Sequence, residues 1–175
     1  VEGAEADDVI GTLCMKFGSE LNNSNKILIL SGDKDFVQLQ VYGNVSQYDP
    51  VRKKDIVTNN AEKFLESLIL SGDRGDGVPN VLSPDTCIID GQRQKPLRET
   101  KIEQLLKADA STLPEDIKRN WIRNRTLIDL RCIPNEVQQS ILRMYEAEAG
   151  KPRDKMFNYF IQHKMKLLME SIGDF

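Results

Sequence analysis

The hydrophobic residues of the chain follow two different patterns. Ile27 to Leu30 are four consecutive apolar residues, and so short a run between polar and glycine residues is typical of a strand buried on both faces. Elsewhere apolar residues recur every three or four positions, which predicts amphipathic helices. The first such helix covers roughly Ala6 to Leu21, and a turn over Asn22–Asn25 leads from it into the strand.

The residues after this strand predict a second one beside it. Phe36 to Leu39 are expected to form a short helix or turn, and Val45 to Tyr48 the next strand, which Asp49-Pro50 ends. Proline lacks the amide hydrogen that a strand ladder needs. Arg52, Lys53 and Lys54 then form a predicted basic loop. A strand, a helical connection and a second strand are typical of the end of a parallel sheet.

The rest of the chain is predicted to be helical. Asn60 is placed to cap a helix that runs to about Ser71, and Gly72 is a natural terminator. Residues 82–98 show no period and contain prolines and a glycine, which predicts a loop or small hairpin. Further helices are expected over Glu99–Lys107, Pro114–Leu130, Asn135–Ala149 and Arg153–Ile172. The sequence therefore predicts an α/β part in residues 1–58 and an all-helical part in residues 59–175.

Acidic residues gather at the ends of three predicted elements. They are Glu5, Asp7 and Asp8 at a helix start, Asp33 and Asp35 after the strand, and Asp73 and Asp76 in a glycine-rich turn. Ligands of open α/β sheets bind beyond the carboxyl ends of the strands. If these ends converge, cations must neutralise the carboxylates, and two divalent ions about 3.5–4 Å apart could also clamp a phosphodiester. Each group alone also has a plainer explanation, as helix cap or turn.

Three motifs carry a family resemblance. Glu5-Ala-Asp-Asp8, Ser31-Gly-Asp-Lys-Asp-Phe36 and Leu70-Ser-Gly-Asp-Arg-Gly-Asp-Gly-Val78 occur in the order and spacing of the 5′-nuclease (flap endonuclease) family. The chain most resembles the T-even-type bacteriophage ribonuclease H branch, and the likeness continues through Trp121–Pro134 and Lys151–Phe160. The resemblance implies the C-terminal part of a PIN-like nuclease domain, followed by a helical region with a helix–turn–helix element that grips duplex DNA.

The resemblance also implies roles for the acidic and glycine residues. A first metal site would be lined by Glu5, Asp7, Asp33 and Asp35, with Asp8 in support, and a second would use Asp73 and Asp76; of these, the catalytic residues would be Asp7, Asp33, Asp35 and Asp76. Two Mg²⁺ ions are expected in a complete site, with Mn²⁺ as a substitute. DNA phosphates would be contacted by Gly72, Arg74, Gly75 and Gly77. The helix–turn–helix would consist of the helix before Gly72, the glycine turn and the next helix.

The activity implied is that of a metal-dependent 5′→3′ exonuclease and flap endonuclease with ribonuclease H activity, which removes RNA primers and 5′ flaps in DNA replication. Its substrates would be nicked or flapped DNA and RNA–DNA duplexes, and a single-strand-binding protein or a sliding clamp are candidate partners. We expect a monomer inside the cell, in the host cytoplasm if a phage encodes it. The chain starts at Val1 without an initiator Met, so we also expect a truncated nuclease domain with impaired catalysis.

Composition limits the protein class. The 175 residues are 39% hydrophobic and 29% charged, which favours a folded globular chain. No apolar stretch approaches membrane-spanning length, and no membrane partner is expected. Three cysteines without metal-ligand spacing, Cys14, Cys87 and Cys132, predict free thiols. The net charge of −3 conceals basic clusters, of which Arg52–Lys54 and Lys118–Arg125 are the strongest candidates for phosphate contacts.

Two other functions remain open. Asp33-x-Asp35 with Gly72-Asp73 also resembles haloacid-dehalogenase-type phosphatases, which use an aspartate nucleophile. That class needs its second acidic motif after a strand, whereas a helix is predicted here, and it leaves Glu5 to Asp8 without a role. The other alternative is a non-catalytic module that binds duplex DNA or a replication partner and holds structural ions. DNA binding without cleavage would distinguish it.

Overall fold

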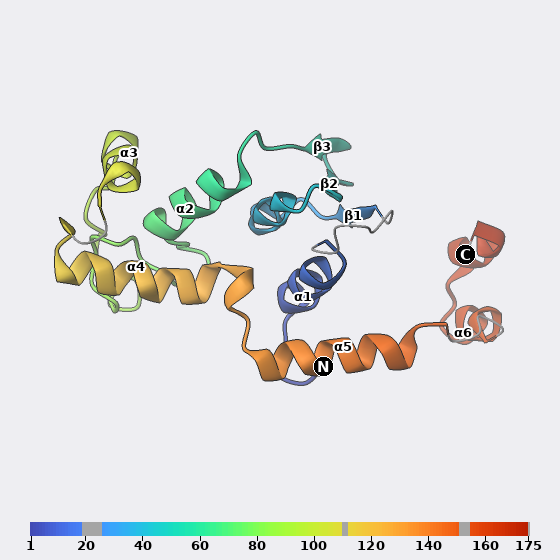
Figure 1. Ribbon diagram of the computed structural model, residues 1–175. Helices are drawn as coiled ribbons and strands as arrows, with labels where there is room; N and C mark the ends of the chain where they lie inside the picture. Colours follow the sequence, from blue (N-terminus) through green and yellow to red (C-terminus); the bar gives the residue numbers. More distant parts are fainter. Residues whose placement is uncertain (19–25, 110–111, 151–154, 175) are drawn as a thin grey trace. The chain divides into compact units, whose positions relative to one another are not determined.

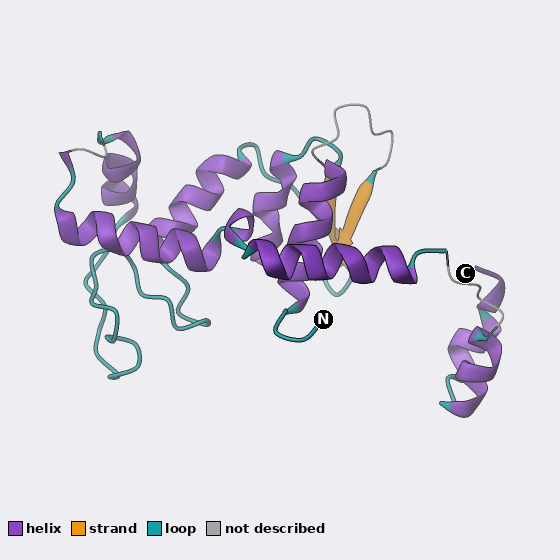
Figure 2. Cartoon of the chain, turned by 60° about the horizontal axis from the view of Figure 1, so that its bottom comes forward, coloured by secondary structure: helices purple, strands orange, loops and turns teal. Residues whose placement is uncertain are grey.

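The computed structural model of the chain describes residues 1–18, 26–109, 112–150 and 155–174 (Figure 1). It contains two compact units, Val1–Leu142 and Arg143–Phe175. The first unit holds a small mixed sheet with helices around it, and Figure 2 shows the strands in orange among purple helices. None of the described helices is long and apolar enough to cross a membrane. The predicted α/β class is confirmed.

The sheet has three strands in the order β1 (Ile27–Leu30), β2 (Val45–Asp49) and β3 (Lys54–Ile56). β1 and β2 are parallel, as predicted, with Ile27 opposite Val45. β3 is antiparallel to β2 and was not predicted, because residues 52–54 were expected to form a loop. The side chain of Asp49 turns the chain back, since its Oδ1 accepts the amides of Val51 and Arg52, each at 2.9 Å.

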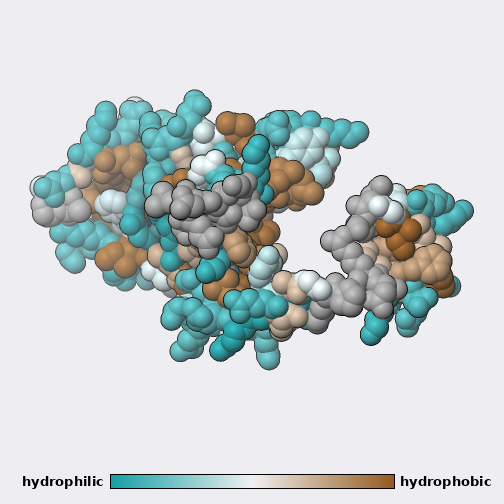
Figure 3. All heavy atoms as spheres, turned by 45° about the vertical axis from the view of Figure 1, so that its right-hand side comes forward, coloured by the Kyte–Doolittle hydropathy of each residue, from teal (hydrophilic) through white to brown (hydrophobic). Residues whose placement is uncertain are grey.

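β1 is buried on one face only, so the expectation of burial on both faces is wrong. Ile29 is 5% exposed, whereas Leu28 is 57% and Leu30 is 64% exposed. Ile29 packs in a core cluster whose other buried members are Cys14, Phe36, Leu39 and Val45. An apolar run looks the same in sequence whether one face or both are covered. On the face drawn in Figure 3, hydrophobic residues form small separate patches within a hydrophilic surface.

The helices of the first unit agree closely with their predicted ranges. The described elements are α1 (Ala6–Gly18), the 3₁₀ helix η1 (Lys34–Val41), α2 (Ala61–Ser71), α3 (Glu99–Lys107), α4 (Glu115–Ile128) and the 3₁₀ helix η3 (Leu130–Cys132), while α5 (Asn135–Glu148) continues into the second unit. Asn60 caps α2 as predicted, because its side chain accepts the amide of Lys63 at 2.8 Å. The predicted turn over residues 22–25 lies outside the described residues.

The last predicted helix is divided. Instead of one helix over Arg153–Ile172, the second unit has α6 (Met156–Gln162), α7 (Lys166–Glu170) and the 3₁₀ helix η4 (Ile172–Asp174). Lys164 has a φ of 54°, a left-handed conformation that ends a right-handed helix. The amide of Met165 then donates to the carbonyl of Phe160 at 2.8 Å. The hydrophobic period of this segment gave no sign of the break.

The expected helix–turn–helix element is not confirmed. Residues 73–98, all of them described, contain turns and no helix, and the next helix, α3, begins at Glu99. Leu70 of α2 packs with Leu105 of α3, and α2 also contacts α4, which lies alongside it in Figure 1. Leu65 and Ile69 of α2 pack with Val78 and with Ile128 of α4. The glycine turn is thus held by a helix that is distant in sequence.

Buried asparagines join α4 to the irregular segment after α2. Asn124 is fully buried, and its Nδ2 donates to the carbonyls of Ile69 at 2.8 Å and Pro79 at 2.9 Å. Asn120 donates in the same way to Val81 and Ser83. Buried carbonyls outside regular structure need such partners. The two side chains therefore fix the chain on the far side of the glycine turn.

Asn124→Ala should destabilise the first unit. The change removes a buried donor to the carbonyls of Ile69 and Pro79, of which Pro79 keeps a hydrogen bond from Arg123 at 3.0 Å, so the free energy of unfolding should fall by about 2 kcal/mol. Urea unfolding followed by circular dichroism measures this. Gln104→Ala, on the exposed surface of α3, is the control and should change stability by less than about 0.5 kcal/mol. Equal stability of the two variants would contradict the structural role of Asn124.

Candidate metal centre

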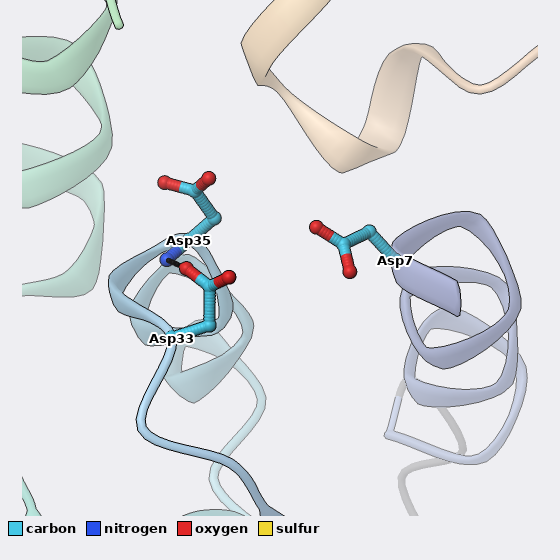
Figure 4. A group of neighbouring side chains, drawn as sticks. All are labelled: Asp7, Asp33 and Asp35. Atoms are coloured by element: carbon cyan, nitrogen blue, oxygen red, sulfur yellow. Dashed lines mark hydrogen bonds between the residues drawn. The ribbon is translucent and has the colours of Figure 1, made fainter. Parts of the chain in front are cut away.

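Three element ends bring five carboxylates together. Asp7 comes from the first turn of α1, Asp33 and Asp35 follow β1, and Asp73 and Asp76 lie in the turn after α2. Asp7, Asp33 and Asp35 form one group and Asp35, Asp73 and Asp76 another; within each, one oxygen per side chain lies within 4.8 Å of the others. Figure 4 shows the carboxylate of Asp7 pointing across to those of Asp33 and Asp35. Asp35 is common to both groups.

Local hydrogen bonds fix the Asp-Lys-Asp turn. The carboxylate of Asp33 accepts the amide of Asp35 at 3.0 Å, the dashed line in Figure 4, and caps η1. The side chain of Gln47, 1% exposed on β2, donates to the carbonyls of Ser31 at 2.8 Å and Asp33 at 2.6 Å. The turn is therefore tied to the neighbouring strand as well as to itself.

Two glycines are required where the backbone passes close to other groups. A Cβ on Gly32 would lie 2.8 Å from Oδ2 of Asp49, which is itself only 3% exposed. Gly72 has a φ of 68°, and a Cβ there would lie 2.4 Å from the carbonyl oxygen of Val78. Any larger residue would displace one of the two acidic turns.

The glycine turn closes on itself. Asp73 and Val78 form an antiparallel bridge, and the amide of Val78 donates to the Asp73 carbonyl at 2.7 Å. The carboxylate of Asp73 accepts the amide of Gly75 at 2.8 Å. This closed turn presents Asp73 and Asp76 on the side that faces Asp35.

Glu5 and Asp8 lie beside the five carboxylates without joining either group. Both line a hollow of about 230 Å³ that four of the five carboxylates also line, all except Asp33. The apolar wall of this acidic hollow is made of Val78, Leu127, Ile128 and Leu130. The carboxylate of Asp8 accepts the amide of Glu5 at 2.9 Å, which is one of the two hydrogen bonds of a helix capping box. This hydrogen bond supports the interpretation of Asp8 as a helix-capping residue.

The arrangement fits a divalent cation. Oδ1 of Asp35 is buried and has no hydrogen-bond partner among the described residues. Burial raises the pKa of Asp35 to about 6, and the nearby Asp33 adds to the increase while Lys34 opposes it. Burial and Asp33 likewise raise the pKa of Asp7. Oxygen ligands with this excess of negative charge are suited to a hard cation.

Lys34 offsets part of this charge, and sequence reasoning missed it. Its Nζ hydrogen-bonds the carboxylate of Asp73 and lies 3.7 Å from Oδ1 of Asp35. The bond to Asp73 raises the pKa of Lys34. Burial acts to raise the pKa of Asp73, but Lys34 and the amide of Gly75 outweigh it, so the pKa is lowered. The sequence signal for this role was the position of Lys34 directly between Asp33 and Asp35.

Gln38 is a second missed residue. It is 4% exposed, and its Nε2 donates to the carbonyl of Asp35 at 2.9 Å and of Ile128 at 3.1 Å. Its Oε1 accepts the amide of Leu130 at 3.0 Å. Gln38 therefore connects the backbone of the shared carboxylate to the end of α4. A buried glutamine cannot be told from a surface one in a single sequence.

Several basic candidates are paired with acids. Arg119 and Arg123 both bind Asp85, and Arg125 binds Glu66. Nε of Arg52 lies 3.7 Å from Oδ2 of Asp49; Lys53 follows in the turn between β2 and β3, and Lys54 is the first residue of β3. Part of the positive charge of these clusters is therefore neutralised by acidic residues of the same protein. The three cysteines are free, as predicted, with Cys14 and Cys87 buried and Cys132 exposed.

Lys34→Met should tighten divalent-ion binding. The ammonium group occupies an oxygen of Asp73 that a cation could use, and its loss also makes the centre more negative. Isothermal titration with Mn²⁺ should show a dissociation constant lower by about tenfold. Lys101→Met, on the exposed surface of α3, should leave it unchanged. Equal or weaker binding by the Lys34 variant would show that this lysine does not compete with the ion.

Asp35→Asn should stabilise the metal-free protein in a pH-dependent way. Because the folded-state pKa of Asp35, about 6, exceeds its ordinary value of 3.8, the folded state binds more protons between these values and loses stability as pH rises through them. The variant should be more stable by about 2 kcal/mol near pH 8, and the difference should vanish near pH 3.5. Urea unfolding in EDTA measures it, with Asp55→Asn as the exposed control. A difference independent of pH would contradict the assignment.

Comparisons with known proteins show the family of the chain. The family described as "T4 RNase H, C terminal" matches residues 59–175, and the "5'-3' exonuclease, N-terminal resolvase-like domain" family matches residues 1–68. The ribonuclease H of Enterobacteria phage T4 is 33% identical over the whole chain, which covers 59% of that relative. The flap endonuclease Xni of Shewanella woodyi is 37% identical over 45% of the chain and 32% of its own length. The chain thus spans less than two thirds of these curated relatives.

Solved structures show the same fold. The T5 D15 protein co-crystallized with metal ions aligns with a TM-score of 0.52 at 17% identity, covering 85% of this chain and 62% of that one. A mutant of T5 5′-exonuclease aligns with a TM-score of 0.51 at 16% identity, covering 82% of this chain and 65% of that one. The fold is therefore the PIN-like fold of these nucleases. Because the "T4 RNase H, C terminal" family matches more than half of the residues of this chain, the chain belongs to the T4 RNase H family of 5′-nucleases.

Proposed function

We propose that the chain carries the metal centre of a 5′→3′ exonuclease and flap endonuclease with ribonuclease H activity, which hydrolyses phosphodiesters with two divalent ions. The observation that supports this most is the pair of three-carboxylate groups that share Asp35. Mg²⁺ is the expected ion, with Mn²⁺ as a substitute, because both take carboxylate and water oxygens. The names of the relatives, a ribonuclease H and a flap endonuclease, support the same reaction class.

The roles of the acids follow from their positions. Asp7, Asp33 and Asp35 would hold one ion, and Asp35, Asp73 and Asp76 the other, with Glu5 and Asp8 beside them. When bound, two such ions would lower the pKa of a bound water so that its hydroxide can act as the nucleophile, and would stabilise the charge on the leaving oxygen. Asp7, Asp33, Asp35 and Asp76 are the residues that we propose as catalytic.

The supporting residues keep these acids in place. Gln47 and Gln38 hold the backbone on either side of the Asp-Lys-Asp turn, so the shared carboxylate is oriented before any ion binds. The apolar wall made by Leu127 and Leu130 limits water on one side of the hollow. Ligands that are already oriented need little reorganisation when the ions bind and the reaction proceeds.

The substrate that we propose is DNA or an RNA–DNA duplex with a nick or a 5′ flap. Gly72, Gly75 and Gly77 would let backbone amides approach phosphate closely, and Arg74 lies in the same exposed turn. Arg52, Lys53 and Lys54 remain proposed phosphate contacts at the turn between β2 and β3. We retain residues 1–58 as nuclease core and 59–175 as helical domain.

The biological setting is also a proposal. Removal of RNA primers and 5′ flaps in replication would place the protein inside the cell, in the host cytoplasm if a phage encodes it. A monomer that works with a single-strand-binding protein or a sliding clamp fits this task. The haloacid-dehalogenase alternative is disfavoured because the second acidic motif follows α2 rather than a strand.

Metal-dependent cleavage tests the proposal. A 5′-labelled nicked duplex with a short flap should be cut at a measurable rate in Mg²⁺, even though impaired catalysis is expected, and not in EDTA, and Asp33→Asn should reduce that rate on the order of 100-fold or more. Asp55→Asn, an exposed acid on β3, should cleave like the parent. Cleavage that survives in Asp33→Asn would refute the metal centre. Duplex binding without any cleavage by the parent chain would favour the non-catalytic module.

A further inference from the structure

The acidic hollow has an apolar side that the metal centre itself does not use. Six carboxylates line the hollow, and its other lining residues are Val78, Leu127, Ile128 and Leu130. Val78 and Ile128 are buried, at 6% and 9% exposed, whereas Leu127 is 64% exposed. Leu127 therefore presents most of its side chain to solvent at the edge of the hollow.

The backbone that carries Leu127 is held firmly against the metal centre. Gln38 is bonded to the carbonyl of Ile128 at 3.1 Å and to the amide of Leu130 at 3.0 Å. The side chain of Asp129 caps η3, and Leu130 packs against the core cluster that α1 and β1 share. The exposed position of Leu127 is therefore fixed by its neighbours and is not the result of a loose helix end.

Leu127 takes no part in the packing of the unit. It belongs to none of the three hydrophobic clusters found among the described residues, although the next residue, Ile128, does. A single exposed apolar residue is common on protein surfaces, and Ile122, 68% exposed on the same helix, is another. Ile122 lines a different hollow, with Trp121 and Arg125. What distinguishes Leu127 is its place beside the carboxylates.

The size of the acidic hollow determines what can reach Leu127. The hollow measures about 230 Å³, and pockets that enclose an organic ligand usually measure about 300–1,000 Å³. It can therefore take a phosphodiester and its ions, but not a whole nucleotide as well. The sugars and bases on either side of that phosphodiester must lie at the edge of the hollow. Leu127 is the most exposed of the apolar lining residues there.

We propose that Leu127 packs against the base next to the phosphodiester that is cleaved, and so determines which bond of the strand lies at the carboxylates. The inference rests on the proposed function and deepens it, because it assigns the residue that sets the position of the cut. Packing between leucine and a base removes apolar surface of both from water. The contact uses neither charge nor hydrogen bonds, so it accepts every base and acts on position rather than on sequence.

The first test places a fluorescent base at each position around the flap junction in turn. In Leu127→Trp the indole should stack on 2-aminopurine at one or two adjacent positions and lower its fluorescence about threefold relative to the parent complex. The duplex is held in Ca²⁺, which takes oxygen ligands in a looser geometry than Mg²⁺, so the signal does not require cleavage. Ile122→Trp, on the same helix but at a different hollow, should give no such decrease at any position.

The second test maps the position of the cut in Mg²⁺. In Leu127→Ala the strand is no longer held at one step, so the ratio of the main product to its neighbours should fall about fivefold. Ile122→Ala should keep the product pattern of the parent. Isothermal titration should show the same Mn²⁺ binding in all variants, because neither residue supplies an oxygen ligand.

The outcomes separate this inference from the proposed function. No decrease in fluorescence at any position with Leu127→Trp, or an equal decrease with Ile122→Trp, would overturn the inference even if the parent cleaves the duplex. An unchanged product pattern in Leu127→Ala would overturn it as well. A decrease confined to the flap junction supports the contact, and if the parent then fails to cleave in Mg²⁺, it is the proposed function that fails.

Discussion

Electrostatic repulsion between five close carboxylates is the constraint that the rest of this structure has to offset. Asp35 bears most of it, because it belongs to both groups, is partly buried, and has an oxygen without a hydrogen-bond partner in the described chain. Lys34 reduces the repulsion from within the same turn. The amide of Gly75 reduces it at Asp73. What remains is an unfavourable charge that a cation would neutralise, so the apo structure already favours ion binding.

Buried glutamine and asparagine side chains hold the irregular segments that bear the acidic residues. Gln38, Gln47, Asn120 and Asn124 are each at most 5% exposed, and each donates to backbone carbonyls beside one of the acidic turns. Backbone that is not in a helix or sheet must find other partners when it is buried. These four residues provide them, and they tie each turn to β2, to α4 or to the α4 terminus. Side-chain hydrogen bonds therefore hold these segments where regular backbone pairing is absent.

Charge is separated across the glycine turn. Its carboxylates line one hollow, and the cation between them lines another with Arg93 and Lys95. All three arginines of α4 are used in pairs with Asp85 and Glu66, which link that helix to the rest of the unit. A net charge of −3 therefore describes the surface poorly. The distribution of unpaired charge, rather than the sum, decides where a phosphate backbone can lie.

The sequence by itself determined most of the element types, the parallel pairing of the first two strands and the three acidic motifs, because hydrophobic period, capping residues and glycines act locally. It also located the acids whose oxygens meet. Tertiary structure alone decided that β1 is covered on one face, that α4 packs on α2 in addition to α3, and that Lys164 divides the last helix. It also decided which cations are paired. These outcomes depend on contacts between residues distant in sequence, and a residue type does not reveal whether its partner is water, a carbonyl or a carboxylate.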